Sequence, residues 1–146
     1  MQFKAATFSL LAAILAAPAA LASPSATPLK VFPDPMFDNA DASLSGVACS
    51  DGANGLLTKG YTTFGSLPSP FIGGSQFVPN WNSEACGSCW KLTYEDKSIF
   101  VIAVDTAGVG FNIAKSAFDA LADEAAEQFG GLEATVEAAD ASDCGF

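Results

Sequence analysis

The chain has 146 residues, 50% of them hydrophobic, a formal net charge of −10, and neither histidine nor arginine. This charge opposes binding to nucleic acid, which depends on Lys and Arg to neutralise phosphates, and to anionic membrane surfaces. A neutral partner such as a polysaccharide meets no such opposition. The absence of histidine excludes Ser-His-Asp and Cys-His catalysis.

The first 22 residues have the pattern of a secretory signal peptide. Lys4 supplies the positive charge, residues 5–16 are almost wholly apolar, and Ala20-Leu21-Ala22 forms the cleavage site. The apolar run is shorter than the ~20 residues that a membrane span needs. We therefore expect a secreted, extracellular protein without a membrane anchor.

Residues 23–30 begin with Ser, Thr, Pro and Ala only, which predicts a flexible N-terminal lead before one domain over residues 31–146. From residue 29 to 83 the chain is rich in turn residues, among them Gly73-Gly74. Turn pairs between short apolar pieces favour short strands joined by tight turns, as in a small barrel or sandwich.

The second half of the chain shows clearer periodicity. Residues 90–94 alternate in polarity and residues 99–104 are all apolar, which predicts two strands joined in a hairpin at Glu95-Asp96. Apolar residues at helical spacing over 112–129 predict a helix that ends at Gly130-Gly131. Residues 132–138 alternate again and predict a last strand. The domain is expected to be mainly β with short helices.

Four cysteines follow the signal peptide: Cys49, Cys86, Cys89 and Cys144. In a secreted chain they predict two disulfides, with three connectivities open. A thioredoxin-like role for the Cys86-x-x-Cys89 motif is disfavoured, because an alternating strand and no helix follows it. Zinc is disfavoured because there is no histidine and only one CxxC pair. We expect no metal and no cofactor.

Asp105 is the acid best placed for chemistry, because it ends the buried strand and opens the glycine loop 106–110. It could contact a ligand, or it could cap that loop by accepting backbone N–H bonds. Asn112 is equally open between a ligand contact and a helix N-cap. Asp51 lies in a Ser-Asp-Gly turn that favours Asp for turn geometry alone, and no second carboxylate stands out for two-carboxylate hydrolysis.

Aromatic side chains are the other means of binding sugars, because their faces pack on the apolar faces of sugar rings. Trp81 lies in a Pro-Asn-Trp-Asn segment and is expected in an accessible loop, whereas Trp90 is expected in the core.

Several motifs together resemble the cerato-platanin family of small secreted fungal proteins. They are the stretch 49–61 (CSDGANGLLTKGY), the segments 81–83 and 86–90, and the segments 103–105 and 110–114, in the family's order. The similarity runs from about Phe37 to Gly145. Differences include Thr106 where the family often has His, and Phe37 in place of a tyrosine.

The resemblance implies a six-stranded double-ψ β-barrel and the disulfides Cys49–Cys86 and Cys89–Cys144. It also implies a non-enzymatic protein that binds chitin or N-acetylglucosamine oligomers, loosens cellulose as expansins do, and elicits plant defence. Cellulose, a plant receptor and the fungal cell wall are the other implied partners and locations, and the expected state is a monomer. The residues implied to bind carbohydrate are Asp105, Asn112, Asp51 and Tyr61.

Two alternative functions stay open. One is a weak glycoside hydrolase that uses Asp105 and an unidentified second carboxylate. The other is a surface-active, self-assembling coat protein, suggested by a mean hydropathy of +0.32 that includes the signal peptide.

Overall fold

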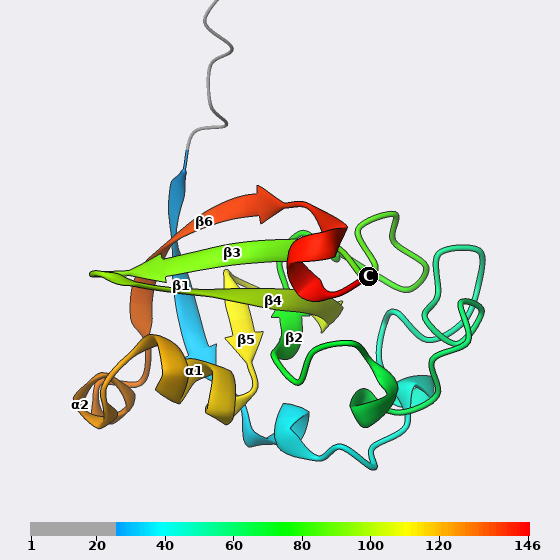
Figure 1. Cartoon of the computed structure of the whole chain (residues 1–146), viewed down its shortest axis with the longest axis horizontal. Coiled ribbons are helices and arrows are strands. Elements are labelled where there is room, and N and C mark those ends of the chain that lie inside the picture. Colours follow the sequence, from blue (N-terminus) through cyan, green and yellow to red (C-terminus); the bar gives the residue numbers. More distant parts are fainter. Residues whose placement is uncertain (1–25) are drawn as a thin grey trace, which may run out of the picture.

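The computed structural model describes residues 26–146, which form a closed barrel of six strands (Figure 1). The strands are β1 (Thr27–Pro33), β2 (Ile72–Ser75), β3 (Cys89–Tyr94), β4 (Lys97–Thr106), β5 (Phe111–Ile113) and β6 (Leu132–Ala139). Their order around the barrel is β1-β5-β2-β4-β3-β6, and β6 closes it by pairing with β1. The expected six-stranded double-ψ β-barrel is confirmed. The expected signal peptide lies outside the described residues.

The lead and the first turn-rich half differ from the prediction. Residues 27–30 are not a flexible lead, because they begin β1 and pair with β6. Between β1 and β2 the chain forms loops and three 3-10 helices instead of short strands. These helices are Pro35–Asp38, Leu44–Gly46 and Phe64–Ser66.

Strand β2 contains the glycine pair that the sequence suggested as a turn. Gly73 and Gly74 are buried between β4, which pairs with β2 in parallel, and β5, which pairs with it in antiparallel fashion. A Cβ atom on Gly74 would lie 2.7 Å from the backbone oxygen of Thr106. Glycine is present here because the neighbouring backbone comes too close for a side chain.

The predicted helix over 112–129 is wrong in extent. Residues 111–113 form β5, and two short helices follow, α1 (Lys115–Leu121) and α2 (Glu124–Gln128). Helix α1 begins where it does because both carboxylate oxygens of Asp38 accept backbone N–H bonds, from Lys115 at 2.8 Å and from Ser116 at 3.1 Å. The apolar spacing nevertheless gave the correct buried face of α1, which includes Phe118 and Leu121.

The predicted β hairpin and last strand are confirmed. Strands β3 and β4 pair from Tyr94–Lys97 to Cys89–Ile102, with Glu95 and Asp96 as the connecting residues. Strand β6 pairs along the other edge of β3. Alternating polarity was sufficient for β6, and a continuous apolar run was sufficient for β4, in which residues 101–104 are all buried.

Two disulfides join loops to this barrel, and their pairing agrees with the resemblance. Cys49–Cys86 ties the loop after β1 to the loop before β3, and Cys89–Cys144 ties β3 to the last 3-10 helix, Ala141–Cys144. They join residues 37 and 55 positions apart. In the chain-entropy model such loops contribute about 4 kcal/mol each to stability.

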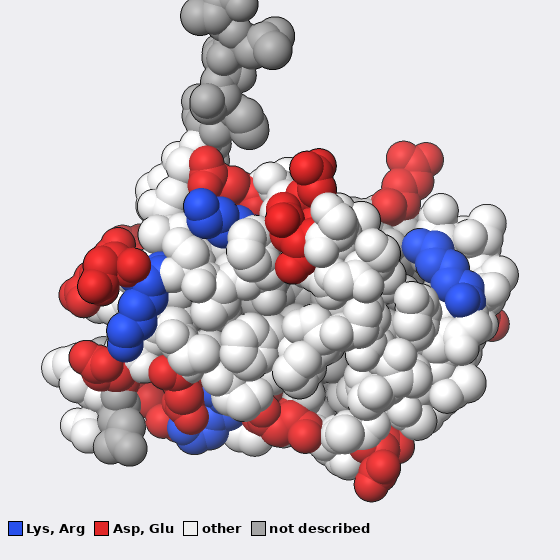
Figure 2. All heavy atoms as spheres, in the orientation of Figure 1, with Lys and Arg blue, Asp and Glu red and all other residues white. Residues whose placement is uncertain are grey.

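On the face shown in Figure 2, acidic side chains outnumber lysines and lie both at the edges and in the upper middle of the face. Helices of the described part are all too short and too polar to cross a membrane.

Candidate functional site

The Asp105 carboxylate lies near the end of β4 and is half-buried. Its Oδ1 accepts backbone N–H bonds from Ala48 at 2.9 Å and Thr106 at 2.8 Å. The Thr106 bond agrees with the expected capping of the loop 106–110, whereas the Ala48 bond comes from a different loop. Its Oδ2 makes no hydrogen bond within residues 26–146, so one oxygen is held in place and the other stays free to accept.

Asn112 lies in β5, on the other side of β2 from Asp105. Both residues are register partners of Gly74, Asp105 across the parallel pairing and Asn112 across the antiparallel one. Two strand spacings of ~4.8 Å place their backbones about 10 Å apart. The helix N-cap interpretation of Asn112 is wrong, because its backbone pairs within the barrel and Asp38 caps α1. In the described chain its side-chain amide makes no hydrogen bond.

Asp51 lies in the loop that follows Cys49, at the exposed surface. Its Oδ1 accepts a 2.6 Å hydrogen bond from the indole Nε1 of Trp81 and a longer one, 3.4 Å, from the Ser50 hydroxyl. The carboxylate thus orients an aromatic ring that is itself exposed. Asp51 also belongs to the same loop as Ala48, which donates to Asp105.

Tyr61 packs differently from the other three predicted residues. Its ring meets Phe146, the last residue, edge-on with centroids 5.7 Å apart, and it is half-buried against the core. A packing role is therefore evident. Its carbohydrate contact stays a prediction.

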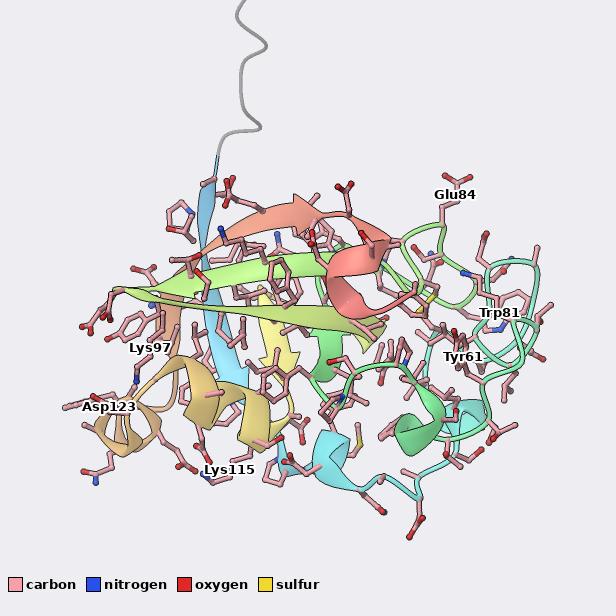
Figure 3. The ribbon with its side chains drawn as sticks, in the orientation of Figure 1. Tyr61, Trp81, Glu84, Lys97, Lys115 and Asp123 are labelled. Carbon is pink, nitrogen blue, oxygen red and sulfur yellow. A yellow bond between two sulfur atoms is a disulfide. The ribbon has the colours of Figure 1, made fainter. Side chains whose placement is uncertain are left out.

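The loop that carries Asp51 and the loop that carries Trp81 are tied to each other. The backbone N–H of Asn54 donates to the side-chain oxygen of Asn82, and the Asn54 amide donates back to the Asn82 backbone oxygen, both at 2.9 Å. The Cys49–Cys86 disulfide joins the same loops. Figure 3 shows Trp81 on these loops at the right-hand end of the molecule, far from Lys97 and Asp123 at the left.

The shortest ion pair within residues 26–146 lies away from these loops, at α1, where Lys115 Nζ is 2.8 Å from Asp119 Oδ1. Hydrogen bonds from Lys115 to Asp119 and Glu127 hold the pKa of the Lys115 ammonium above its ordinary value. This network joins α1 to α2. No group of side chains that could hold a metal ion occurs among the described residues.

A family model described as Cerato-platanin matches residues 29–146. The chain belongs to the cerato-platanin family. It is 46% identical over 143 residues to the "Heat-stable 19 kDa antigen" of Coccidioides immitis, a match that covers 95% of this chain and 98% of that protein.

Solved cerato-platanins have the same fold. The crystal structure of cerato-platanin 3 from M. perniciosa gives a TM-score of 0.78 at 44% identity, over 82% of this chain and all of that one. The solution structure of the fungal elicitor Cerato-Platanin gives 0.70 at 36% identity, over 79% of this chain and 95% of that one. The names of these relatives describe an antigen, a cerato-platanin and an elicitor, and none describes an enzyme.

Sequence reasoning missed the contact between Trp81 and Asp51. The two residues are 30 positions apart and lie in separate loops. The sequence did indicate an accessible loop around Trp81 and a turn at Asp51, and both predictions were correct. Neither of them indicated that the two side chains are in contact. Trp90, expected in the core, is half-buried and stacks on Phe77 with ring centroids 4.3 Å apart.

Proposed function

We propose that this cerato-platanin is a secreted, non-hydrolytic protein that binds chitin or N-acetylglucosamine oligomers, loosens cellulose, and is perceived by plants as an elicitor. The elicitor role is supported by the solved relative described as a fungal elicitor. Secretion is supported by the signal-like residues 1–22 and by two disulfides, which persist in oxidising compartments.

The observation that carries the binding proposal is the arrangement of Asp105 and Asn112. Each presents hydrogen-bonding atoms that no described residue satisfies, namely Asp105 Oδ2 and the Asn112 amide. Sugar hydroxyls and the acetamido group of N-acetylglucosamine can donate to the carboxylate and exchange bonds with the amide. A fixed carboxylate is a good acceptor because no freedom is lost when the ligand binds.

Charge restricts the ligand class. The chain carries −10 net, and two of its carboxylates belong to the candidate site: Asp51 in the loop that contains Ala48, and Asp105 in β4, which accepts a bond from Ala48. Like charges across an interface oppose association, so polyanionic glycans are disfavoured and neutral ones are favoured. N-acetylglucosamine oligomers and cellulose are both neutral.

The absence of hydrolysis is part of the proposal. Glycoside hydrolysis needs two carboxyl groups that flank the scissile bond. Asp105 Oδ1 is occupied by the backbone N–H groups of Ala48 and Thr106, which leaves Oδ2 to meet a ligand. The sequence suggests no second carboxylate as its partner, so we assign Asp105 to hydrogen bonding and not to hydrolysis.

The test is a titration of the protein with N-acetylglucosamine oligomers while backbone NMR shifts are followed. We expect shifts around Asp105 and Asn112, and their loss in Asp105→Ala. Asp96→Ala, in the hairpin turn, is the control that should bind as the wild type does. Absence of shifts at millimolar ligand would contradict binding. Release of reducing sugar from chitin or cellulose, abolished in Asp105→Ala, would instead support the hydrolase.

A further inference from the structure

We infer that Trp81 is an aromatic platform for one ring of a neutral oligosaccharide whose other rings lie toward Asp105 and Asn112. The inference rests on the proposed function, because it takes those two residues as the rest of the same binding row. It adds an aromatic contact to the polar contacts of Asp105 and Asn112. It also implies that the protein distinguishes oligosaccharides by their number of sugar units.

The Trp81 ring is both exposed and held. Its side chain is 56% exposed, yet its Nε1 donates a 2.6 Å hydrogen bond to Asp51 Oδ1. The other tryptophan, Trp90, has one face covered by the stacked Phe77 ring. A large aromatic surface left in water has an unfavourable free energy that a packed sugar ring reduces. The ring loses little freedom on binding, since Asp51 already orients it.

The loop under Trp81 is also fixed in an unusual conformation. Asn82, the next residue, has φ of +58°, in the left-handed region that non-glycine residues rarely adopt. Two hydrogen bonds with Asn54 hold it there. Opposite it, Gly52 has φ of +85°, and a Cβ there would lie 2.6 Å from Asn82 Oδ1. Such conformations cost free energy and persist only where the surroundings enforce them.

Ala48 connects this platform to the polar residues. Its N–H donates to Asp105 Oδ1 at 2.9 Å, and its oxygen accepts from Asn82 N at 3.3 Å. Asn82, the residue beside Trp81, is thus linked to the Asp105 carboxylate through a single residue, Ala48. Asn112 is two strand spacings from Asp105, ~10 Å, so the three groups together span more than one sugar ring and suit an oligomer.

The chain offers a matched control at its other end. Phe129 is 87% exposed, follows α2 and lines the same surface hollow as Asp123. Figure 3 shows Asp123 at the end of the molecule opposite Trp81. Its phenyl ring has no polar atom that a hydrogen bond could orient. If any exposed aromatic ring sufficed, Phe129 would contribute to binding as well.

The experiment measures dissociation constants of N-acetylglucosamine oligomers, from the monomer to the hexamer, by calorimetry and NMR. For Trp81→Ala we expect roughly three- to ten-fold weaker binding of the longest oligomers, the size of one aromatic contact, and unchanged binding of the monomer at Asp105. Asp51→Ala keeps the ring but frees it, so it should weaken the long oligomers to a smaller extent. Phe129→Ala should match the wild type at every length.

The outcomes separate this inference from the proposed function. If the wild type binds no oligomer, the proposed function fails and this inference with it. If the wild type binds but Trp81→Ala has equal affinity at every length, the platform is disproved while the proposed function stands. A change in sedimentation on Trp81→Ala with unaltered glycan affinity would assign the ring to self-association and overturn the inference. Unchanged backbone NMR shifts in the barrel confirm that each variant is folded.

Discussion

Asp38 caps helix α1 across 77 positions of sequence, since its Oδ2 accepts the backbone N–H of Lys115 at 2.8 Å and its Oδ1 accepts that of Ser116. The cap joins the segment after β1 to the helix after β5. Helix α1 has no side-chain cap of its own, because its N-cap position is Ala114. The start of the helix is therefore decided by a residue from the other half of the chain.

Replacing Asp38 by Ala should lower the free energy of unfolding by about 1–2 kcal/mol, the usual contribution of an N-cap side chain. Denaturant unfolding followed by circular dichroism measures the effect. Asp41→Ala is the control, because Asp41 is an exposed acid of the same segment whose side chain makes no hydrogen bond in the described chain. Equal stabilities of the two variants would rule out the capping role.

Gly74→Ala should be strongly destabilising, by roughly 2 kcal/mol or more, because the added Cβ must push the Thr106 backbone aside. Gly46→Ala should change the stability by less than about 0.5 kcal/mol, since its Cβ meets nothing within 4 Å. Thermal unfolding of both variants gives the comparison. A tolerated alanine at position 74 would show that β2 and β4 can separate there.

The ion pairs of Lys115 should stabilise the fold at neutral pH, and this stabilisation should be lost in strongly alkaline buffer. The Asp119 and Glu127 carboxylates raise the pKa of Lys115 on folding. Stability from a raised pKa is complete below the unfolded value, about 10.4 for lysine, and is lost as pH rises through the folded value. The unfolding free-energy difference between wild type and Lys115→Gln should therefore be constant at neutral pH and shrink in strongly alkaline buffer.

Added salt provides an independent check of that network. Both ion pairs are solvent-exposed, so molar salt should screen them and reduce the same difference. If the difference in unfolding free energy between wild type and Lys115→Gln does not change with salt, Lys115 stabilises α1 by packing and not by charge.

Binding of neutral N-acetylglucosamine oligomers should hardly respond to salt, because no ion pair forms with the ligand. Deacetylated oligomers, which carry ammonium groups, should bind more tightly at low salt and lose that advantage as salt rises. The reason is that Asp51 lies in the loop of Ala48, which contacts Asp105 in β4. Calorimetric titrations at low and high sodium chloride measure both. Tighter binding of an anionic oligosaccharide would contradict the charge argument.

Local sequence patterns predicted the strands correctly where burial of the strand's own residues decides its structure. The hairpin around Glu95-Asp96 follows from the alternating residues 90–94 and the apolar run 99–104, and the strand after Gly130-Gly131 follows from alternating polarity. The structure confirms both. The prediction of a helix over 112–129 was wrong in extent because residues 111–113 form a strand that pairs with β1 and β2. The prediction of a turn at Gly73-Gly74 was wrong for a similar reason. Glycine is needed there because the backbones of β4 and β5 lie too close for a side chain.

Composition and spacing by themselves determined that the chain is acidic, lacks histidine, and carries a carboxylate, Asp105, at the end of a buried strand. They also placed Trp81 in an accessible loop. Tertiary structure alone decided that Ala48 anchors one oxygen of Asp105 and that Asp51 orients the Trp81 ring. Those contacts join residues 57 and 30 positions apart. Local patterns report only neighbours along the chain, whereas barrel closure and the Cys49–Cys86 disulfide bring these loops together.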